Sequence, residues 1–393
     1  MSAPVPLLPD IDFAYDDVPN LHELLDQLRA EGPVVPVKYL NDTVYLINSF
    51  KELKQAFSDE EHFACAAAHK LHSVPSLGIT MQALIGEEHR VNRGLVSKPF
   101  FPKQMRAAIE ALIEPTAKEL LDEIAGKEEV EFVSAFTKPF PFRVITRLLG
   151  IPVDDEDKLL HWAVKLIDYP WDPEGAVKAR HDFADYMKPI IDDRRNNPAD
   201  DIISELAVAE FEGNSLSDEE IYSFLRMLFP AGSDTTYKLG GSMFYAILCD
   251  AKIRAKAIQN DQARQDIVQE ALRWQAPVAL LPRMCSKDTE LGGVKIKQGQ
   301  WMLFGIAAAN NDPDVFEDPR RFNPDRKNKI MTFGHGEHFC LGSHLARREL
   351  ETAIRVVLER FPNICLCADK EVSFTGGVLR GTPELWVRPH RAL

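Results

Sequence analysis

The sequence predicts one large domain that is mainly α-helical with a small amount of β-structure. Apolar residues recur at helical spacing over long stretches, whereas strand-like alternation is confined to short segments that lie far apart. Neither an internal repeat nor a low-complexity linker divides the 393 residues. Length alone would allow two or three domains of roughly 150 residues, but the even composition favours one.

Helix boundaries can be placed at two points with particular clarity. Ser217 and Glu220 form a capping box, which opens a long apolar pattern towards Ile247. The helix that begins at Asp261 must end before Pro277, because a proline disfavours helical backbone in the residue that precedes it. The predicted helices cover residues 109–124, 142–149, about 217–247, 261–274 and 341–361.

The predicted strands are few and separated by long helical stretches. Any sheet must therefore be small and assembled from distant parts of the chain. The candidate strands are Val34–Val37, Thr43–Ile47, Val294–Ile296, Trp301–Phe304 and Leu385–Val387.

Composition and charge exclude several classes of protein. Apolar residues make up 45% and charged residues 27%, which is ordinary for a globular chain and unlike a disordered one. The formal net charge of −14 argues against a nucleic-acid partner, since phosphates bind basic surfaces. Six irregularly spaced cysteines indicate free thiols in a reducing compartment. With no signal peptide and no apolar run of about 18 residues, we expect a cytoplasmic protein without a membrane partner.

The most informative segment is Phe333-Gly-His-Gly-Glu-His-Phe-Cys340-Leu-Gly342, which precedes the last helix. Its glycines allow positive φ angles and close approach of the backbone to a flat ligand. A cysteine at a helix N-terminus has its thiolate favoured by free N–H groups and by the helix dipole. The pattern therefore indicates a thiolate that is ready to bind a metal.

Taken by itself, this segment leaves other interpretations open. A lone cysteine is most often simply a buried loop residue, and His335, His338, Cys340 and His344 together could suggest zinc. The whole pattern Phe-x-x-Gly-x-His-x-Cys-x-Gly is more specific, and it resembles the haem-binding signature of the cytochrome P450 family. That resemblance implies the cytochrome P450 fold, with haem b between the long distal helix and the cysteine helix. It also implies that Cys340 is the axial ligand of the iron and that Phe333 contacts the cofactor.

Two charged residues on the helix of residues 261–274 extend the resemblance. Glu270 and Arg273 are an i,i+3 pair of a kind that is common on helix surfaces. Their place about 70 residues before the cysteine is similar to the Glu-x-x-Arg pair of the family. In the family an arginine from a later loop joins this pair, and Arg321 is the predicted third member, with Arg326 as the less favoured alternative. The implied role is structural: the cluster locks the helix against the thiolate loop.

The long helix contains Pro230-Ala-Gly232-Ser-Asp234-Thr235-Thr, a composition that is unfavourable inside a helix. One interpretation is a packing kink. The functional interpretation is an opened hydrogen-bond ladder that leaves room for a small molecule and frees a carboxylate and a hydroxyl to move protons. The segment resembles the family's acid–alcohol pair, which implies catalytic roles for Asp234 and Thr235 and a cofactor contact at Gly232.

Haem propionates require cations or hydrogen-bond donors at fixed positions. His89 and Arg93 are similar to the family's His-x-x-x-Arg on the helix below the haem, and their i,i+4 spacing places both on one face. Arg283 follows the Glu-x-x-Arg helix by ten residues, as a propionate-binding arginine does in the family, although Cys285 stands where the family often has a small residue. His338 would be the fourth contact.

The implied function is a monooxygenase that inserts one oxygen atom from O₂ into a hydrophobic organic substrate. By resemblance the pocket is lined by residues 63–86, 169–176, Val278, Leu280 and Leu281. No dinucleotide-binding fingerprint is present, so electrons are expected from a separate 2Fe–2S ferredoxin and its reductase. The candidate docking cations are Lys103, Arg106, Arg347 and Arg348.

Three other functions compete with this one. A peroxide-driven enzyme of the same fold would be expected to lack the Asp234–Thr235 pair. A haem sensor or electron carrier needs no opened distal helix and commonly uses His or Met ligands. A zinc protein would explain the His and Cys cluster but neither Glu270 nor Arg283.

Overall fold

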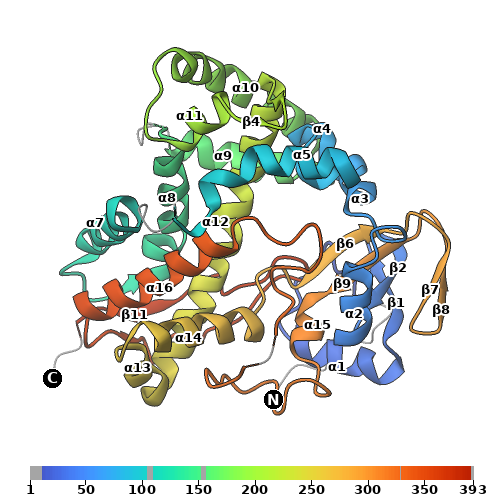
Figure 1. The fold of residues 1–393 in the computed structure, drawn as a ribbon. Coiled ribbons are helices and arrows are strands. Elements are labelled where there is room, and N and C mark those ends of the chain that lie inside the picture. Colours follow the sequence, from blue (N-terminus) through green and yellow to red (C-terminus); the bar gives the residue numbers. More distant parts are fainter. Residues whose placement is uncertain (1–10, 104–108, 152–155, 328, 391–393) are drawn as a thin grey trace.

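The structure is a computed structural model that describes residues 11–103, 109–151, 156–327 and 329–390. It is mainly helical, as predicted. The long helix α12 (Asp218–Cys249) passes through the middle of the molecule, most helices lie around it, and a small sheet with α1 (Leu21–Glu31) lies to one side (Figure 1).

The other α-helices differ widely in length, and the shorter helical turns join them. The α-helices are α2 (Phe50–Phe57), α3 (Cys65–His72), α4 (Val74–Leu77), α5 (Gly86–Ser97), α7 (Glu114–Ile124), α8 (Pro139–Leu149), α9 (Glu156–Ile167), α10 (Pro173–Asn196), α11 (Ile202–Ala207), α13 (Ala251–Ala257), α14 (Asp261–Trp274), α15 (Ile306–Asn310) and α16 (Ser343–Arg360). The turns are the 3₁₀-helices η2 (Met81–Ala83) and η3 (Lys98–Phe100) and the π-helices η4 (Ile109–Ile113) and η5 (Val133–Thr137).

The largest sheet joins strands that lie far apart in the sequence, as expected. Its order is β1-β2-β9-β6, and β2 pairs in parallel with β9, so that Ile47 lies opposite Phe304. Its strands are β1 (Val34–Tyr39), β2 (Asp42–Ile47), β6 (Leu280–Met284) and β9 (Trp301–Gly305). The smaller sheets contain β3 (Val130–Glu131), β4 (Glu210–Phe211), β5 (Asn214–Ser215), β7 (Thr289–Leu291), β8 (Val294–Ile296), β10 (Cys365–Leu366) and β11 (Trp386–Arg388).

Helix α12 begins where the sequence predicts. The hydroxyl of Ser217 accepts a hydrogen bond from the backbone N–H of Glu220 at 3.4 Å, and the Glu220 carboxylate accepts one from the Ser217 N–H at 2.8 Å. These two bonds satisfy backbone donors that the first turn would otherwise leave free. The helix then stays helical for 32 residues, of which 20 are buried, and it forms the main support of the molecule.

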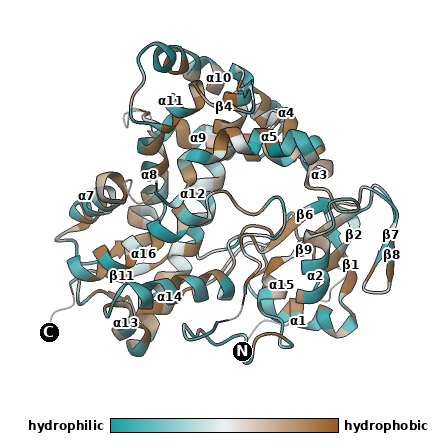
Figure 2. Ribbon diagram, viewed as in Figure 1, coloured by the Kyte–Doolittle hydropathy of each residue, from teal (hydrophilic) through white to brown (hydrophobic). Residues whose placement is uncertain are grey.

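The hydrophobic core is divided between the helical part of the molecule and the sheet. One cluster of buried apolar residues surrounds α12, and two smaller clusters lie on the sheet side, between the sheet, α1 and α2. Hydrophilic and hydrophobic stretches alternate along the outer helices (Figure 2), as expected of helices that bury one face. Within the described residues, none of the helices combines the length and the apolar character that a bilayer crossing requires.

Candidate active site

The cysteine loop ends at the N-terminus of α16. The backbone N–H of Cys340 donates to the carbonyl of Phe333 at 2.9 Å, which closes the loop. Gly334 and Gly336 have φ angles of +72° and +83°, and a Cβ at Gly336 would lie 2.7 Å from the carbonyl oxygen of Phe57. Both glycines are therefore required by backbone geometry, as the sequence suggested.

Opposing effects act on the sulfur of Cys340. Burial is the largest and raises the pKa of the thiol overall, whereas the backbone N–H groups of Gly342 and Ser343 and the guanidinium groups of Arg93 and Arg347 act to lower it. Gly342 and Ser343 lie at the start of α16, Arg347 lies one turn further along it, and Arg93 belongs to α5. The donor set fits a thiolate that is held as a metal ligand.

The four predicted propionate-binding residues meet beside this loop. The rings of His89 and His338 lie 4.1 Å apart, and Arg93 donates to the carbonyl of Phe339 at 2.6 Å. Burial, followed by His89, Arg283 and Arg93, lowers the pKa of His338 from 6.5 to about 3. The Nε2 atoms of both histidines are buried and have no hydrogen-bond partner among the described residues. Nitrogen atoms left unpaired inside a protein are suited to an anionic ligand such as a haem propionate.

Two further residues reach this cluster without any signal in the sequence. His69 on α3 has a pKa lowered to about 3 by burial, by Arg283 and by His338, and its Nδ1 lies 3.0 Å from the Ser73 hydroxyl. A Glu60 carboxylate oxygen lies 3.8 Å from Nε2 of His338, and burial raises the pKa of Glu60. No motif links either residue to Arg283, more than 200 positions away, so only the fold reveals their proximity.

The distal helix is continuous through the Pro230 segment. The chain remains helical from Asp218 to Cys249, but Pro230 has no N–H, so the bond that position 230 would donate to residue 226 is absent and the ladder is open at that point. The hydroxyl of Thr235 donates to the carbonyl of Ala231 at 2.8 Å, and Ser233 bonds in the same way to Phe229 at 2.7 Å. Side-chain donors to carbonyls one turn back let a helix accommodate this composition without interruption.

The acid and the alcohol lie on neighbouring faces of α12. Asp234 Oδ1 lies 3.2 Å from the ammonium group of Lys238, whereas Asp234 Oδ2 is buried and has no hydrogen-bond partner among the described residues. The position that shares a face with Thr235 is the exposed Ala231, one turn away. A Cβ at Gly232 would lie 3.8 Å from Ile145 of α8, and the predicted cofactor contact at Gly232 stays a prediction.

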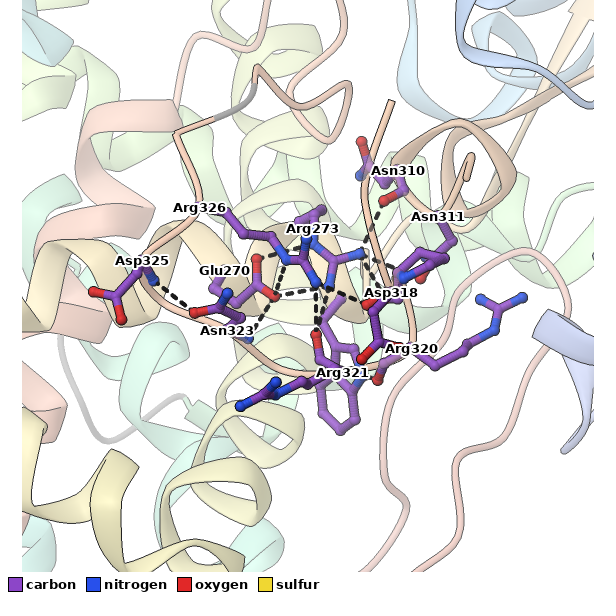
Figure 3. A network of polar contacts seen from close by, with 12 residues as sticks. Glu270, Arg273, Asn310, Asn311, Asp318, Arg320, Arg321, Asn323, Asp325 and Arg326 are labelled. Atoms are coloured by element: carbon purple, nitrogen blue, oxygen red, sulfur yellow. Dashed lines mark hydrogen bonds and ion pairs between the residues drawn. The ribbon is translucent and has the colours of Figure 1, made fainter. Parts of the chain in front are cut away.

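The Glu270 cluster is fully built, but with a different third arginine (Figure 3). Arg273 donates to both carboxylate oxygens of Glu270, at 2.9 and 2.8 Å. Nε of Arg326 lies 3.3 Å from Glu270 Oε1, whereas Arg321 contributes only its backbone carbonyl, to Arg273 at 3.3 Å. The prediction of Arg321 is therefore wrong and Arg326 takes its place. The loop folds back after Asn323, whose N–H binds Glu270 at 2.8 Å, and this turn delivers residue 326 to the carboxylate.

This cluster also braces the cysteine loop. Arg273 binds the carbonyl of Asn310 at 3.0 Å, and the side chain of Asn310 accepts from Met331 N–H at 2.7 Å and donates to the Thr332 hydroxyl at 2.8 Å. Thr332 in turn donates to the carbonyl of Leu272 at 2.6 Å. The chain of contacts runs from α14 to the residue directly before Phe333, which agrees with the predicted locking role.

The predicted pocket residues at and before β6 lie on two different sides of the sheet. Leu280 is completely buried in the cluster that includes α1, which leaves it no surface for a ligand and corrects its assignment to the pocket. Val278 and Leu281 are partly buried on the other side, and Val278 forms an isolated bridge with Leu379. Successive side chains of a strand point to opposite faces, so Leu280 and Leu281 cannot line the same cavity.

The candidate docking cations have different environments. The guanidinium of Arg347 lies 4.4 Å from the centre of the Phe333 ring, and Arg348 pairs with Glu351 at 2.7 Å. Lys103 and Arg348 are exposed, whereas Arg347 is half-buried. Arg106 lies outside the described residues. The structure does not bring His335 and His344 together with Cys340: among the described residues, no group of three or more His, Cys, Asp or Glu could hold a metal ion.

Known proteins define the class to which this fold and this site belong. The family model for cytochrome P450 matches residues 158–384. The polyketide biosynthesis cytochrome P450 PksS of Bacillus subtilis is 37% identical over 303 residues, which span 76% of this chain and 75% of that protein. The 6-deoxyerythronolide B hydroxylase of Saccharopolyspora erythraea is 30% identical over 92% of this chain and 94% of its own length.

Solved structures agree with these relatives. The structure of PksS superposes with a TM-score of 0.87 at 32% identity and covers 95% of this chain and 97% of that one. The structure of CYP109E1 from Bacillus megaterium in complex with testosterone gives a TM-score of 0.84 at 30% identity, covering 95% and 100%. The chain belongs to the cytochrome P450 family. It is a cytochrome P450 monooxygenase, and its cofactor is haem with an axial cysteine thiolate.

Proposed function

We propose that this monooxygenase hydroxylates a hydrophobic organic molecule, with Cys340 as the axial ligand and electrons from a separate 2Fe–2S ferredoxin and its reductase. The observation that carries the proposal is the position of Cys340. Its sulfur lies at the N-terminus of α16 beside the N–H groups of Gly342 and Ser343, next to the cluster of His89, Arg93 and His338.

Each of these residues then has a defined task. Haem with a thiolate ligand supplies oxygen binding and cleavage of the O–O bond. The N–H groups of Gly342 and Ser343 favour the charged form of the sulfur, against the burial that raises the pKa of the thiol. The imidazoles of His89 and His338 and the guanidiniums of Arg93 and Arg283 bind the propionates. Cleavage of O₂ to water consumes two protons, and Asp234 and Thr235 of α12 deliver them.

The substrate class follows from the apolar character of the residues near the site. From the last turn of α3 to the start of α5 the chain exposes Leu71, Ile79 and Ile85, each with more than half of its surface accessible. A second apolar group, Val164, Ile167 and Trp171, is exposed near the end of α9. Large exposed apolar side chains on one connecting segment favour contact with a hydrophobic ligand. CYP109E1, whose structure was solved in complex with testosterone, and the relative named 6-deoxyerythronolide B hydroxylase are consistent with this class.

The visible spectrum of the reduced protein with CO tests the proposal. A strongly red-shifted Soret band is expected for the wild type, because only thiolate-ligated haem produces it. Cys340→Ser should lose this band while the fold is retained by circular dichroism. A wild-type protein without the band, or a Cys340→Ser protein that keeps it, contradicts the assignment.

The proton-delivery pair and the electron donor have separate tests. Thr235→Ala should keep the CO band but uncouple electron consumption from product, and a fully coupled variant would remove Thr235 from the proposal. Turnover with a ferredoxin should fall as salt rises, because docking of an acidic partner on Lys103 and Arg348 is screened. Salt-independent turnover contradicts that docking surface.

A further inference from the structure

An acidic side chain lies in the part of the site where a propionate calls for cations and hydrogen-bond donors. Glu60 precedes α3, and its carboxylate oxygen Oε2 lies 3.8 Å from Nε2 of His338. That nitrogen is buried and has no hydrogen-bond partner among the described residues, which suits it to a haem propionate. Glu60 is therefore a carboxyl group beside the atom on which a second carboxyl group is to bind.

Local structure keeps Glu60 in this position. Its Oε2 also accepts a hydrogen bond from the N–H of Cys65, the first residue of α3, at 3.4 Å. Helix α3 in turn packs against β6, the strand that carries Arg283. The side chain of Glu60 is 29% exposed, so it is partly shielded from water and can still exchange a proton with solvent.

The imidazoles near Glu60 are neutral at physiological pH. Burial is the largest of the effects that lower the pKa of His338 to about 3, and burial likewise leads the effects that lower the pKa of His69 on α3 to about 3. A neutral imidazole carries a single N–H. Nε2 of His338 can therefore donate a hydrogen bond to only one of the two carboxyl groups.

The charged groups around Glu60 cannot balance two carboxylates. Among the described residues whose charge acts on Glu60, only Arg283 is a cation. Glu337 of the cysteine loop and Asp59 have the same sign as Glu60, and Asp59 is already paired with His62 at 2.9 Å. One guanidinium thus matches one carboxylate, and a propionate would add a second.

Protonation of Glu60 resolves this excess of negative charge. Burial is the largest effect on Glu60 and raises the pKa of its carboxyl group, against the N–H of Cys65 and the charge of Arg283. Two carboxyl groups that share one site raise the pKa of one of them further. Once protonated, Glu60 is an O–H donor and no longer repels the other carboxylate.

We propose that Glu60 is a further residue of the propionate site, and that it takes up a proton when haem binds and donates a hydrogen bond to the propionate. The proposal rests on the proposed function, which places that propionate on His338. The proton comes from solvent and returns to it when haem leaves. Because binding takes up one proton, haem affinity should fall about tenfold per pH unit while the pH lies between the pKa of Glu60 without haem and its higher pKa with haem.

The central test is the rate at which haem leaves the loaded protein, measured as transfer to excess apomyoglobin between about pH 5 and pH 8. Glu60→Gln mimics the protonated acid at every pH. The two proteins should lose haem at equal rates at the acidic end, and wild type should lose it about tenfold faster at the alkaline end. The ratio of the two rates cancels the contributions of Cys340 and of the other ionisable groups that both proteins share.

The neighbouring residue supplies the matched control. Glu61 is exposed and pairs with Lys287, so Glu61→Gln should follow wild type at every pH. A ratio of wild type to Glu60→Gln that does not change with pH overturns the proposal. So does a Glu60→Gln protein that loses haem faster than wild type, because the ionised carboxylate would then support the site.

A second measurement needs only the wild type and decides the matter if Glu60→Gln does not fold. In haem dimethyl ester both propionates are uncharged, so Glu60 has no second carboxylate beside it. The rate of loss of haem relative to that of the ester should rise about tenfold over the same pH range, and a constant ratio overturns the proposal. The CO spectrum separates the two levels: a wild type without the red-shifted band contradicts the proposed function itself, whereas a normal band with constant ratios contradicts only the role of Glu60.

Discussion

Two acid–base pairs on helices of this protein, one on α14 and one on α12, have opposite surroundings. Glu270 and Arg273 on α14 have side chains that are 3% and 1% exposed, and both carboxylate oxygens are bonded. Asp234 and Lys238 on α12 are 22% and 19% exposed, and one carboxylate oxygen has no partner among the described residues. The same local sequence pattern thus yields a closed cluster in one place and an open one in the other.

Under the proposed function, the difference separates a structural from a chemical use of the same residue types. Each hydrogen bond to Glu270 ties another segment of the chain to α14, and leaving this buried carboxylate unpaired would be costly. Asp234 is less buried and is paired through Oδ1 with Lys238 alone. The two carboxylates therefore differ both in burial and in the number of hydrogen bonds that they accept.

The largest loss of stability is expected at Glu270, where both carboxylate oxygens accept hydrogen bonds. Glu270→Gln should lower the free energy of unfolding by about 3–5 kcal/mol, because Arg273 and Arg326 are then left buried without their counter-charge. Urea unfolding of the haem-loaded protein measures it. Glu87→Gln, in an exposed pair with Arg90, is the control and should leave the unfolding midpoint unchanged. A loss below about 1 kcal/mol for Glu270→Gln would mean that the cluster is not a structural lock.

The corrected third member of the cluster has its own test. Arg326→Ala removes the guanidinium from Glu270 and from the carbonyl of Asp318, and it should cost about 1–3 kcal/mol. Arg321→Ala keeps the backbone carbonyl that Arg273 uses and should stay within about 0.5 kcal/mol of wild type. Equal losses in the two variants, measured by urea unfolding, would contradict the correction.

Lowering the pH should destabilise the folded protein through His22, a buried residue whose pKa Arg273 helps to lower. Burial, then Arg320 and Arg380, and finally Arg273 lower its pKa from 6.5 to about 3. Because the unfolded chain binds this proton first, the free energy of unfolding should fall as pH drops below 6.5, by about 1.4 kcal/mol per pH unit from this residue. His22→Gln should flatten the slope, and the exposed His161→Gln should not. A slope unchanged in His22→Gln would show that this residue is protonated in the folded state.

The smallest effect on stability is expected in the open cluster. Asp234→Asn should change the free energy of unfolding by no more than about 1 kcal/mol, since the pair is partly solvated and only one oxygen is engaged. Urea unfolding beside Glu270→Gln gives the comparison directly. A loss for Asp234→Asn as large as that for Glu270→Gln would abolish the distinction between the clusters.

Local signals were sufficient for much of the fold. The capping box at Ser217 marked the start of α12, and the expected helix at Asp261–Trp274 has the observed bounds. The expected strands occur, each shifted or extended by no more than two residues. These features depend on neighbours in the sequence, where hydrophobic period and capping chemistry act directly. The 24-residue helix α10 was not recognised, since its apolar period is weak.

The errors at the site have a different origin. Whether Arg321 or Arg326 meets Glu270 depends on how the loop turns at Asn323, which no periodicity encodes. Leu280 was placed correctly in its strand but on the wrong face, because a shift of one residue redirects a side chain. His69 and Glu60 carry no motif, and only tertiary folding brings them beside Arg283.

The parallel pairing of β2 with β9 has a consequence for how the chain is made. About 250 residues separate the two strands, and β1 and β2 leave the ribosome long before β9 exists. At about 5–20 residues per second, their hairpin waits for roughly 13–50 s with one edge unpaired. An unpaired strand edge can pair with another chain, so the N-terminal hairpin is open to aggregation until β9 has been synthesised.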